Sequence, residues 1–154
     1  MALSPRKINT FLALKLPAAF MCGVRLKSID AQRATTAVTF RWINQNPFNS
    51  MFWAVQGMAA ELSTGALVMS YIKKRGEPVS MLVANNKATF SKKAIGKIIF
   101  TCTDGEAIRK AIDAAILSGE GKTCWMRAEG KDRAGDVVSV FHFEWTVKAK
   151  SQKH

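Results

Sequence analysis

The first apolar residues of the chain recur at three- and four-residue intervals, at Ile8, Phe11, Leu12 and Leu16. This spacing predicts an amphipathic helix. Ser4 and Pro5 precede these residues, and their residue types favour the N-cap and the first position of a helix. Lys15 and Pro17 interrupt the apolar run, which argues against a signal peptide. The N-terminal segment therefore predicts an ordinary structural helix.

Most of the remaining chain alternates apolar and polar residues, which is the period of a half-buried strand. Six such stretches are rich in β-branched and aromatic residues and predict strands at about 22–27, 35–42, 79–90, 97–103, 122–131 and 137–148. The first two and the last two stretches form hairpins across short polar turns. Between the fourth and the fifth, Asp104 opens a short amphipathic helix that ends near Ser118.

One segment is apolar on nearly all sides. Residues 51–72 contain a single charged side chain, Glu61, and predict a helix over about 50–74. Its candidate end signals are Asn46 with Pro47, or Ser50, before the helix, and Gly76 with Pro78 after it. A helix of this kind among six strands predicts an α+β domain in which an antiparallel sheet of about five to six strands wraps around the helix.

The same apolar segment is also long enough to cross a membrane, and Lys73, Lys74 and Arg75 would give it a positive flank. Against this alternative, Glu61 lies at the centre of the segment, where inserting a carboxylate into the membrane costs about 2.5–3.5 kcal/mol. The predicted strands also need an apolar partner, and no other element is long enough to provide one. The sequence therefore favours a helix inside a domain over a membrane span.

Composition adds a strong positive charge to this picture. The 154 residues fit one domain, 1–154, and carry 23 basic against 11 acidic residues, for a net charge of +12. Such a balance attracts nucleic acid, anionic lipid or a phosphate-bearing cofactor. Residues from about 148 onwards predict a flexible basic tail. Three widely spaced cysteines without a CxxC pair predict free thiols in a cytoplasmic protein and no metal site.

Two glycines flank the acidic residue of the long helix. Gly57, Glu61 and Gly65 are spaced at four-residue intervals and form one stripe on a helix. Glycine inside a helix costs roughly 0.8–1.0 kcal/mol relative to alanine, so another backbone or a slim ligand is expected to approach there. The alternative is close packing against a strand or a partner helix, with the carboxylate of Glu61 bonded to a backbone N–H.

The segment Asn46 to Val68 reads NPFNSMFWAVQGMAAELSTGALV, after a predicted hairpin and before four further strands. Its N-P-x-x-S start and M-A-A-E-L-S-T-G centre resemble the central helix of the hotdog-fold thioesterase superfamily. Within that superfamily the segment looks most similar to an uncharacterised branch of small single-domain proteins. The order of predicted elements agrees with a hotdog fold along nearly the whole chain.

The resemblance implies an acyl-CoA thioesterase that works as a homodimer or a tetramer. Matched along the helix, Glu61 takes the place of the acid that serves as general base or nucleophile. Related enzymes often open this helix with His-Gly-Gly, whose backbone N–H polarises the thioester carbonyl. This chain has Phe52, Trp53 and Ala54 there instead, and a Phe-Trp pair is expected to shape or fill the acyl entrance.

Helix geometry bears on how such a site is assembled. Phe52 and Glu61 lie nine residues apart, which is about 14 Å along one helix, so two antiparallel copies are needed to bring both to one carbonyl. The candidate substrate-binding residues are Asn46, Asn49, Trp53, Ala54, Gly57, Thr64 and Gly65. Lys92, Lys93 and Lys97 are candidate ligands for the phosphates of coenzyme A, which enters as part of the substrate. No other cofactor is implied.

Two further functions stay open at this point. The first is a non-catalytic hotdog protein that binds acyl-CoA or another acyl ligand. The second is a basic nucleic-acid-binding protein, although no RNA-recognition, helix-turn-helix or zinc-finger pattern accompanies the charge. His142 lies opposite Phe141 and Phe143 in the strand alternation, so we interpret it as a solvent-side residue rather than a catalytic partner.

Overall fold

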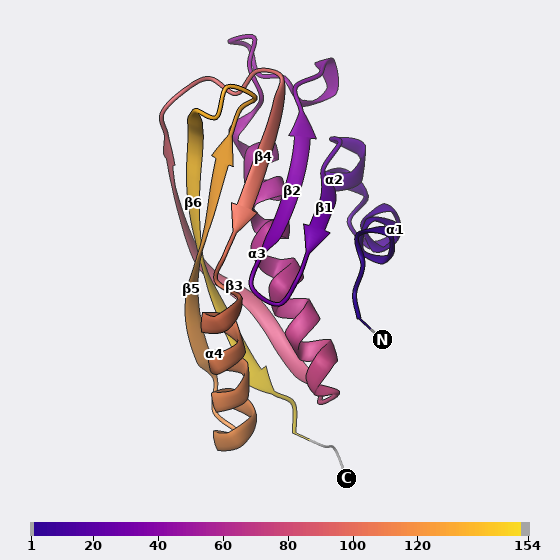
Figure 1. Ribbon diagram of the computed structural model, residues 1–154, viewed down its shortest axis with the longest axis vertical. Helices are drawn as coiled ribbons and strands as arrows, with labels where there is room; N and C mark the ends of the chain where they lie inside the picture. Colours follow the sequence, from indigo (N-terminus) through magenta and orange to yellow (C-terminus); the bar gives the residue numbers. More distant parts are fainter. Residues whose placement is uncertain (1, 152–154) are drawn as a thin grey trace.

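The computed structural model describes residues 2–151 as an α+β domain in which one long helix crosses a curved sheet (Figure 1). The helices are α1 Pro5–Lys15, α2 Pro17–Met21, α3 Trp53–Arg75 and α4 Gly105–Ser118, with a 3-10 turn, η1, at Trp42–Asn44. The strands are β1 Arg25–Ile29, β2 Ala34–Thr39, β3 Val79–Phe90, β4 Lys97–Cys102, β5 Lys122–Lys131 and β6 Val137–Ala149. The element order agrees with the prediction, and α2 and η1 are additions to it.

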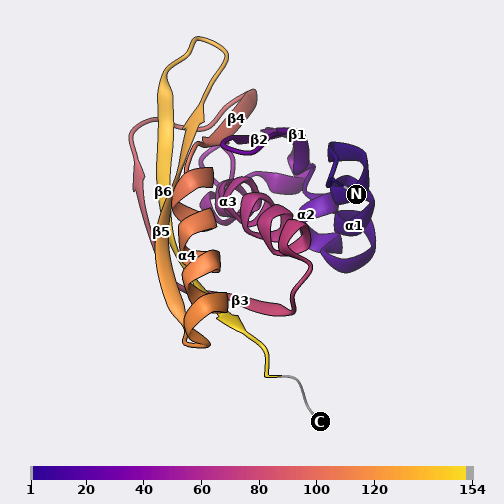
Figure 2. The same cartoon turned by 60° about the horizontal axis from the view of Figure 1, so that its bottom comes forward.

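All six strands form one antiparallel sheet in the order β1-β2-β4-β5-β6-β3. The sheet curves around α3, and Figure 2 shows α4 on the same side as α3, with α1 and α2 beside it. This confirms the predicted wrapped-helix architecture. Strand β3 follows α3 directly in the chain but pairs only with β6, so it forms one edge of the sheet.

Several element ends differ from the predicted ones. Strand β2 ends at Thr39 rather than near 42, because the chain turns into η1 at Trp42. The side chain of Ser4 accepts a hydrogen bond from the Lys7 backbone N–H, so Ser4 caps α1 as predicted. Strand β6 continues to Ala149, which places Lys148 in the sheet and not in a tail. The predicted tail otherwise includes residues 152–154, which lie outside the described residues.

The predicted N-caps of α3 are wrong. Phe52 occupies the N-cap position, and no side chain caps the helix there. Asn46 and Ser50 lie instead in the preceding loop and bond to each other, with the Asn46 amide nitrogen 3.0 Å from the Ser50 hydroxyl. At the other end, Gly76 adopts a left-handed conformation with φ of 71°, which explains why the helix stops where the sequence predicts.

The sheet-facing side of α3 supplies the core together with the inner face of the sheet. Large side chains such as Phe100 and Phe141 are almost fully buried there. Polar groups in the core are paired: the Thr36 hydroxyl donates to the Ala59 carbonyl at 2.6 Å, and the Ser139 hydroxyl donates to the Gln56 side chain at 2.8 Å. Unpaired polar groups would be costly in this interior, so these bonds fix how the helix sits on the sheet.

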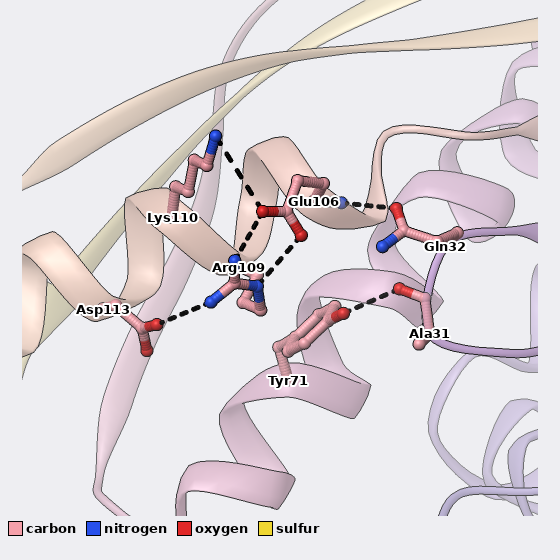
Figure 3. A network of polar contacts seen from close by, with 7 residues as sticks. All are labelled: Ala31, Gln32, Tyr71, Glu106, Arg109, Lys110 and Asp113. Atoms are coloured by element: carbon pink, nitrogen blue, oxygen red, sulfur yellow. Dashed lines mark hydrogen bonds and ion pairs between the residues drawn. The ribbon is translucent and has the colours of Figure 1, made fainter.

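Polar contacts join α4 and the C-terminal half of α3 to the β1–β2 turn (Figure 3). The Tyr71 hydroxyl donates to the Ala31 carbonyl at 2.7 Å, and the Glu106 backbone N–H donates to the Gln32 side chain at 3.0 Å. Arg109 pairs with Glu106 one turn earlier on α4. Exposed ion pairs contribute about 0–1 kcal/mol each, so apolar packing holds α4 and these contacts orient it.

The structure also bears on the membrane alternative and on the cysteines. Across residues 2–151 no helix has both the length and the apolar character that crossing a membrane requires. Cys22, Cys102 and Cys124 are all free, and Cys102 is fully buried. Burial raises the pKa of the Cys102 thiol to about 12, which keeps it protonated and unreactive at neutral pH.

Candidate functional site

An apolar groove runs along the side of α3 that the sheet leaves uncovered. It has a volume of about 480 Å³ and lies between α3, the junction of α1 with α2, and the edge of the sheet. Its lining residues are Phe11, Leu12, Lys15, Leu16, Pro17, Ala18, Ala19, Met58, Glu61, Leu62, Gly65, Met69, Met81 and Trp145. Glu61 and Lys15 carry the only formal charges in this lining.

Glu61 is exposed in the single chain, whereas its neighbours Ala60 and Leu62 are buried. The expectation of a helix enclosed on all sides is therefore wrong at this residue, because the sheet covers α3 from one side. The carboxylate nevertheless stands among apolar side chains of the groove, and this partial desolvation raises the pKa of Glu61 above its ordinary value. Among the described residues no cation or hydrogen-bond donor pairs with its side chain.

The two glycines predicted to share a stripe with Glu61 differ in what surrounds them. Gly57 packs against the Phe141 ring, and a methyl group added at Gly65 would lie 3.2 Å from the Trp145 indole. Both glycines therefore serve close packing against β6, as the alternative interpretation held. Gly65 also lines the groove, whereas Gly57 does not.

Thr64 faces the sheet and does not reach the groove. It is fully buried, its hydroxyl donates to the Glu61 carbonyl at 2.9 Å, and it accepts the Trp145 indole N–H at 2.8 Å. Thr64 is therefore not placed to bind a substrate in the groove, because it is buried and its hydroxyl already donates one hydrogen bond and accepts another. Through Trp145, which lines the groove, Thr64 instead fixes one wall of it.

The N-terminus of α3 presents backbone donors without partners. Within residues 2–151, the N–H groups of Trp53 and Ala54 donate to no backbone or side-chain oxygen, while the next N–H, of Val55, donates to the Phe52 carbonyl at 3.0 Å. Free donors at a helix start favour a negatively charged oxygen. Eight residues separate Trp53 from Glu61, so the donors lie about 12 Å from it along the axis.

Phe52 and Trp53 project from the start of α3, and their rings meet edge to face with centroids 6.0 Å apart. Trp53 lines a second, open hollow of about 380 Å³ between the start of α3 and the β3–β4 loop. That hollow also contains Asn46, Lys92 and Lys93, and it is separate from the groove at Glu61. One chain therefore keeps the predicted acid and the predicted carbonyl site apart.

The predicted asparagine ligands serve the loop before α3. The side-chain oxygen of Asn46 accepts the Phe48 backbone N–H at 2.9 Å, and its amide nitrogen donates to Ser50. Asn49 adopts a positive φ of 56°, which asparagine tolerates better than most residues. Their role in binding a substrate near Glu61 is not supported, because neither residue lines the groove.

Two of the lysines predicted to bind phosphate, Lys92 and Lys93, make contacts within the protein. The Lys92 ammonium lies 2.6 Å from Asp132 and 2.7 Å from Asp136, and both carboxylates raise its pKa. These partners come from the β5–β6 hairpin, about forty positions away in the sequence, so no local pattern revealed them. Lys93 donates to the Phe48 carbonyl at 3.2 Å. Lys92 is therefore not a free phosphate ligand.

Sequence reasoning missed most of the groove. Met81 at the start of β3 and Trp145 near the end of β6 meet the α1–α2 junction only through the sheet topology. One sequence signal could have indicated the groove. Phe11 and Leu16 continue the apolar spacing of α1, yet they are partly exposed and line the groove. Within the described chain no group of three or more His, Cys, Asp or Glu residues is placed to hold a metal ion.

Solved structures with the same architecture cover nearly the whole chain. A protein of unknown function from Pseudomonas aeruginosa, described as a probable thioesterase, has a TM-score of 0.81 at 20% sequence identity, over 97% of this chain and 99% of that one. A protein of unknown function from Chlorobaculum tepidum has a TM-score of 0.81 at 15% identity, over 97% and 99%. A thioesterase from Haemophilus influenzae has a TM-score of 0.74 at 12% identity, over 100% and 97%.

At these identities the likeness establishes the hotdog fold and not the reaction. No curated protein is significantly similar to the chain. One family model, with the description "Domain of unknown function (DUF4442)", matches residues 5–147. The chain therefore belongs to the DUF4442 family and has the hotdog fold that the resemblance in its central helix predicts.

Proposed function

We propose that this protein is a homodimeric thioester hydrolase whose substrate is an acyl-CoA or a related acyl thioester. The observation that carries the proposal is Glu61, the one carboxylate on an apolar groove that is large enough for an acyl chain. A carboxylate with a raised pKa is suited to remove a proton from water near neutral pH. The thioesterase named among the structural neighbours supports the same reaction class by analogy.

In the proposed reaction, the Glu61 carboxylate takes a proton from a water molecule as the water oxygen bonds to the thioester carbon. The carbonyl oxygen becomes negatively charged and accepts hydrogen bonds from the free N–H groups of Trp53 and Ala54 at the start of α3 in the second chain. The carbon–sulfur bond then breaks, and the proton held by Glu61 passes to the leaving thiolate. The products are a carboxylic acid and a free thiol such as coenzyme A.

The site needs two chains because the donors and the acid lie about 12 Å apart on one helix. The edge strand β3 provides a surface on which a second chain can add. Residues 84–90 of β3 are all exposed, and the outer edge of the strand has no pairing partner among the described residues. A two-fold pairing of β3 with β3 would make the two α3 helices antiparallel, so the start of one faces Glu61 of the other.

A second candidate function is binding of an acyl ligand without hydrolysis. The observation that favours it is the exposed Phe52–Trp53 pair at the start of α3. In a dimer of the proposed kind these rings lie beside the free N–H groups, where they compete with a thioester for space. Under this alternative, acyl-CoA would raise the melting temperature without being consumed.

Hydrolysis of a panel of acyl-CoA thioesters by the wild-type protein and by Glu61→Gln tests the proposal. Loss of the base is expected to lower kcat by about 10²–10⁴-fold, while the apolar groove keeps its affinity for the acyl chain. Lys15→Gln, which changes the other charged residue of the groove lining, is the matched control. Equal rates for wild type and Glu61→Gln would remove Glu61 from the chemistry. Binding with no turnover in either protein would support the second function.

A further inference from the structure

A cluster of exposed apolar side chains lies at one end of the molecule, away from the groove. Trp42 is 82% exposed, Phe48 70%, Ile95 56% and Ile43 46%. We call these four residues the loop-end patch. They belong to the β2–α3 and β3–β4 connections, which lie at the top of Figure 1, at the end of the sheet opposite to α4. None of them lines the groove that contains Glu61.

The loop-end patch stands on two loops that are tied to each other. The Phe40 backbone N–H donates to the Gly96 carbonyl at 2.9 Å, and the Met51 backbone N–H donates to the Ala94 carbonyl at 2.9 Å. The Lys93 ammonium reaches the Phe48 carbonyl at 3.2 Å. These bonds hold the two connections side by side, so the four exposed side chains lie on neighbouring segments. Monomeric proteins rarely gather large apolar side chains on one surface unless something covers them.

The charged side chains around the loop-end patch that form no ion pair within residues 2–151 are all positive. Arg41, Lys93 and Lys97 belong to the same connections or flank them, and none of the three forms an ion pair within residues 2–151. The nearby carboxylates of Asp132 and Asp136 both lie against Lys92. The start of α3 adds the positive end of its helix dipole. The partner of this surface is therefore expected to be anionic as well as apolar.

From this combination we infer that the loop-end patch docks the protein on an anionic lipid surface. Tryptophan and phenylalanine favour the boundary between headgroups and acyl chains, and basic residues beside them are attracted to anionic headgroups. A second copy fits the surface poorly, since two patches in contact would bring Arg41, Lys93 and Lys97 of both chains together. This inference does not depend on the reaction proposed for Glu61.

Co-sedimentation of the full-length protein with lipid vesicles tests the inference. We expect binding to vesicles of phosphatidylcholine containing about one-third phosphatidylglycerol, and much weaker binding to phosphatidylcholine alone. The double variant Trp42→Ala/Phe48→Ala is expected to bind about tenfold more weakly, because its interfacial side chains are lost. Lys93→Gln is expected to bind about fivefold more weakly, because one charge is lost.

The matched control is Leu117→Ala, since Leu117 is 91% exposed on α4, at the other end of the sheet. It should bind vesicles like the wild type, and all variants should keep the wild-type melting temperature. Equal vesicle binding by wild type and Trp42→Ala/Phe48→Ala would overturn the inference, because it would reduce the attraction to net charge alone. A smaller oligomer for the double variant in solution, without any vesicle binding by the wild type, would assign the patch to a protein interface instead. Acyl-CoA hydrolysis in the absence of vesicles should be unchanged in Trp42→Ala/Phe48→Ala and in Leu117→Ala, which keeps this test separate from the test of Glu61.

Discussion

The two sides of α3 are built from similar residues but differ in how their polar groups are satisfied. On the sheet-facing side, the buried Thr64 hydroxyl donates to the backbone carbonyl of Glu61 and accepts the indole N–H of Trp145. The Gln56 side chain accepts a hydrogen bond from the Ser139 hydroxyl. On the groove side, the Glu61 carboxylate stands among apolar side chains with no partner among the described residues. Thr64 and Gln56 are buried and therefore bonded within the protein, whereas Glu61 is exposed in the single chain. A carboxylate whose pKa is raised by the apolar walls of a groove is a candidate for chemistry.

The difference shows which feature of the helix indicates chemistry. The glycine stripe and the threonine drew attention in the sequence, yet the structure uses them to bring α3 close to β6. The residue that keeps unused bonding capacity is Glu61. Substitutions at Thr64, at the two glycines and at Glu61 test this contrast.

The largest effect on stability is expected for Thr64→Val. Valine fills the same volume but leaves the buried Trp145 indole N–H without an acceptor, which costs about 1–3 kcal/mol. Urea unfolding of the variant measures this loss. Thr64→Ser keeps the hydroxyl, loses one methyl group and should lose at most about 1 kcal/mol. If the valine variant were as stable as the wild type, the hydroxyl bond would not fix the helix on the sheet.

A smaller effect with opposite signs is expected for the two glycines. In Gly65→Ala the new methyl group lies 3.2 Å from the Trp145 ring, whose indole N–H is held by Thr64, and we expect a loss of about 1 kcal/mol. In Gly57→Ala the nearest atom, on the Phe141 ring, is at the ordinary contact distance of 3.4 Å. That variant should gain up to about 0.8 kcal/mol from helix propensity. Thermal unfolding of both compares them directly, and equal changes would contradict the packing difference.

The smallest effect concerns the stability of Glu61→Gln. The pKa of Glu61 is raised in the folded state, so the folded protein binds this proton more tightly than the unfolded chain does. The contribution of Glu61 to the stability of the wild-type protein is therefore largest below about pH 4.3, the pKa of a glutamate in the unfolded chain. This contribution falls as the pH rises through the raised pKa of the folded state. The glutamine variant lacks this fall and should be somewhat more stable than wild type at neutral pH. The free energy of unfolding of both proteins, measured below about pH 4.3 and at neutral pH, tests this difference. A glutamine variant less stable than wild type at neutral pH would indicate a hidden partner of the carboxylate.

Elements with strong local patterns were predictable. The bounds of β3 and β5 agree with the alternation of their sequences, and Ser4 caps α1 as its position next to Pro5 indicates. The fold class followed from one long apolar helix among six strands and from the resemblance of its centre to hotdog proteins. These features depend on residues close together in the chain, which is why the sequence alone carries them.

The site was harder to predict because its parts meet through tertiary structure. Hydropathy shows that α3 is apolar, but only the position of the sheet decides that Glu61 is on the uncovered side. The pairing of Lys92 with Asp132 and Asp136 joins two loops that are distant in the sequence. Asn46 has the residue type of a ligand, but its side chain is used by the loop in which it lies.

Each proposed site combines the start of one α3 with Glu61 of another chain. Glu61→Gln removes the acid of such a site, and Trp53→Pro removes one of its backbone donors. Proline lacks the backbone N–H and suits the first position of a helix. The preceding residue, Phe52, already has φ of −59° and ψ of 132°, a conformation compatible with a following proline. Trp53→Ala, which keeps the N–H and removes the indole, is its control.

The decisive measurement is acyl-CoA hydrolysis after dissociated chains of Glu61→Gln and Trp53→Pro are mixed and reassembled. Each variant alone should be nearly inactive. Half of the reassembled dimers should combine the two variants, and each such dimer has one site in which both groups are intact, so the mixture should regain about a quarter of the wild-type activity. A mixture as inactive as its parents, despite formation of the mixed dimer, would contradict the shared site.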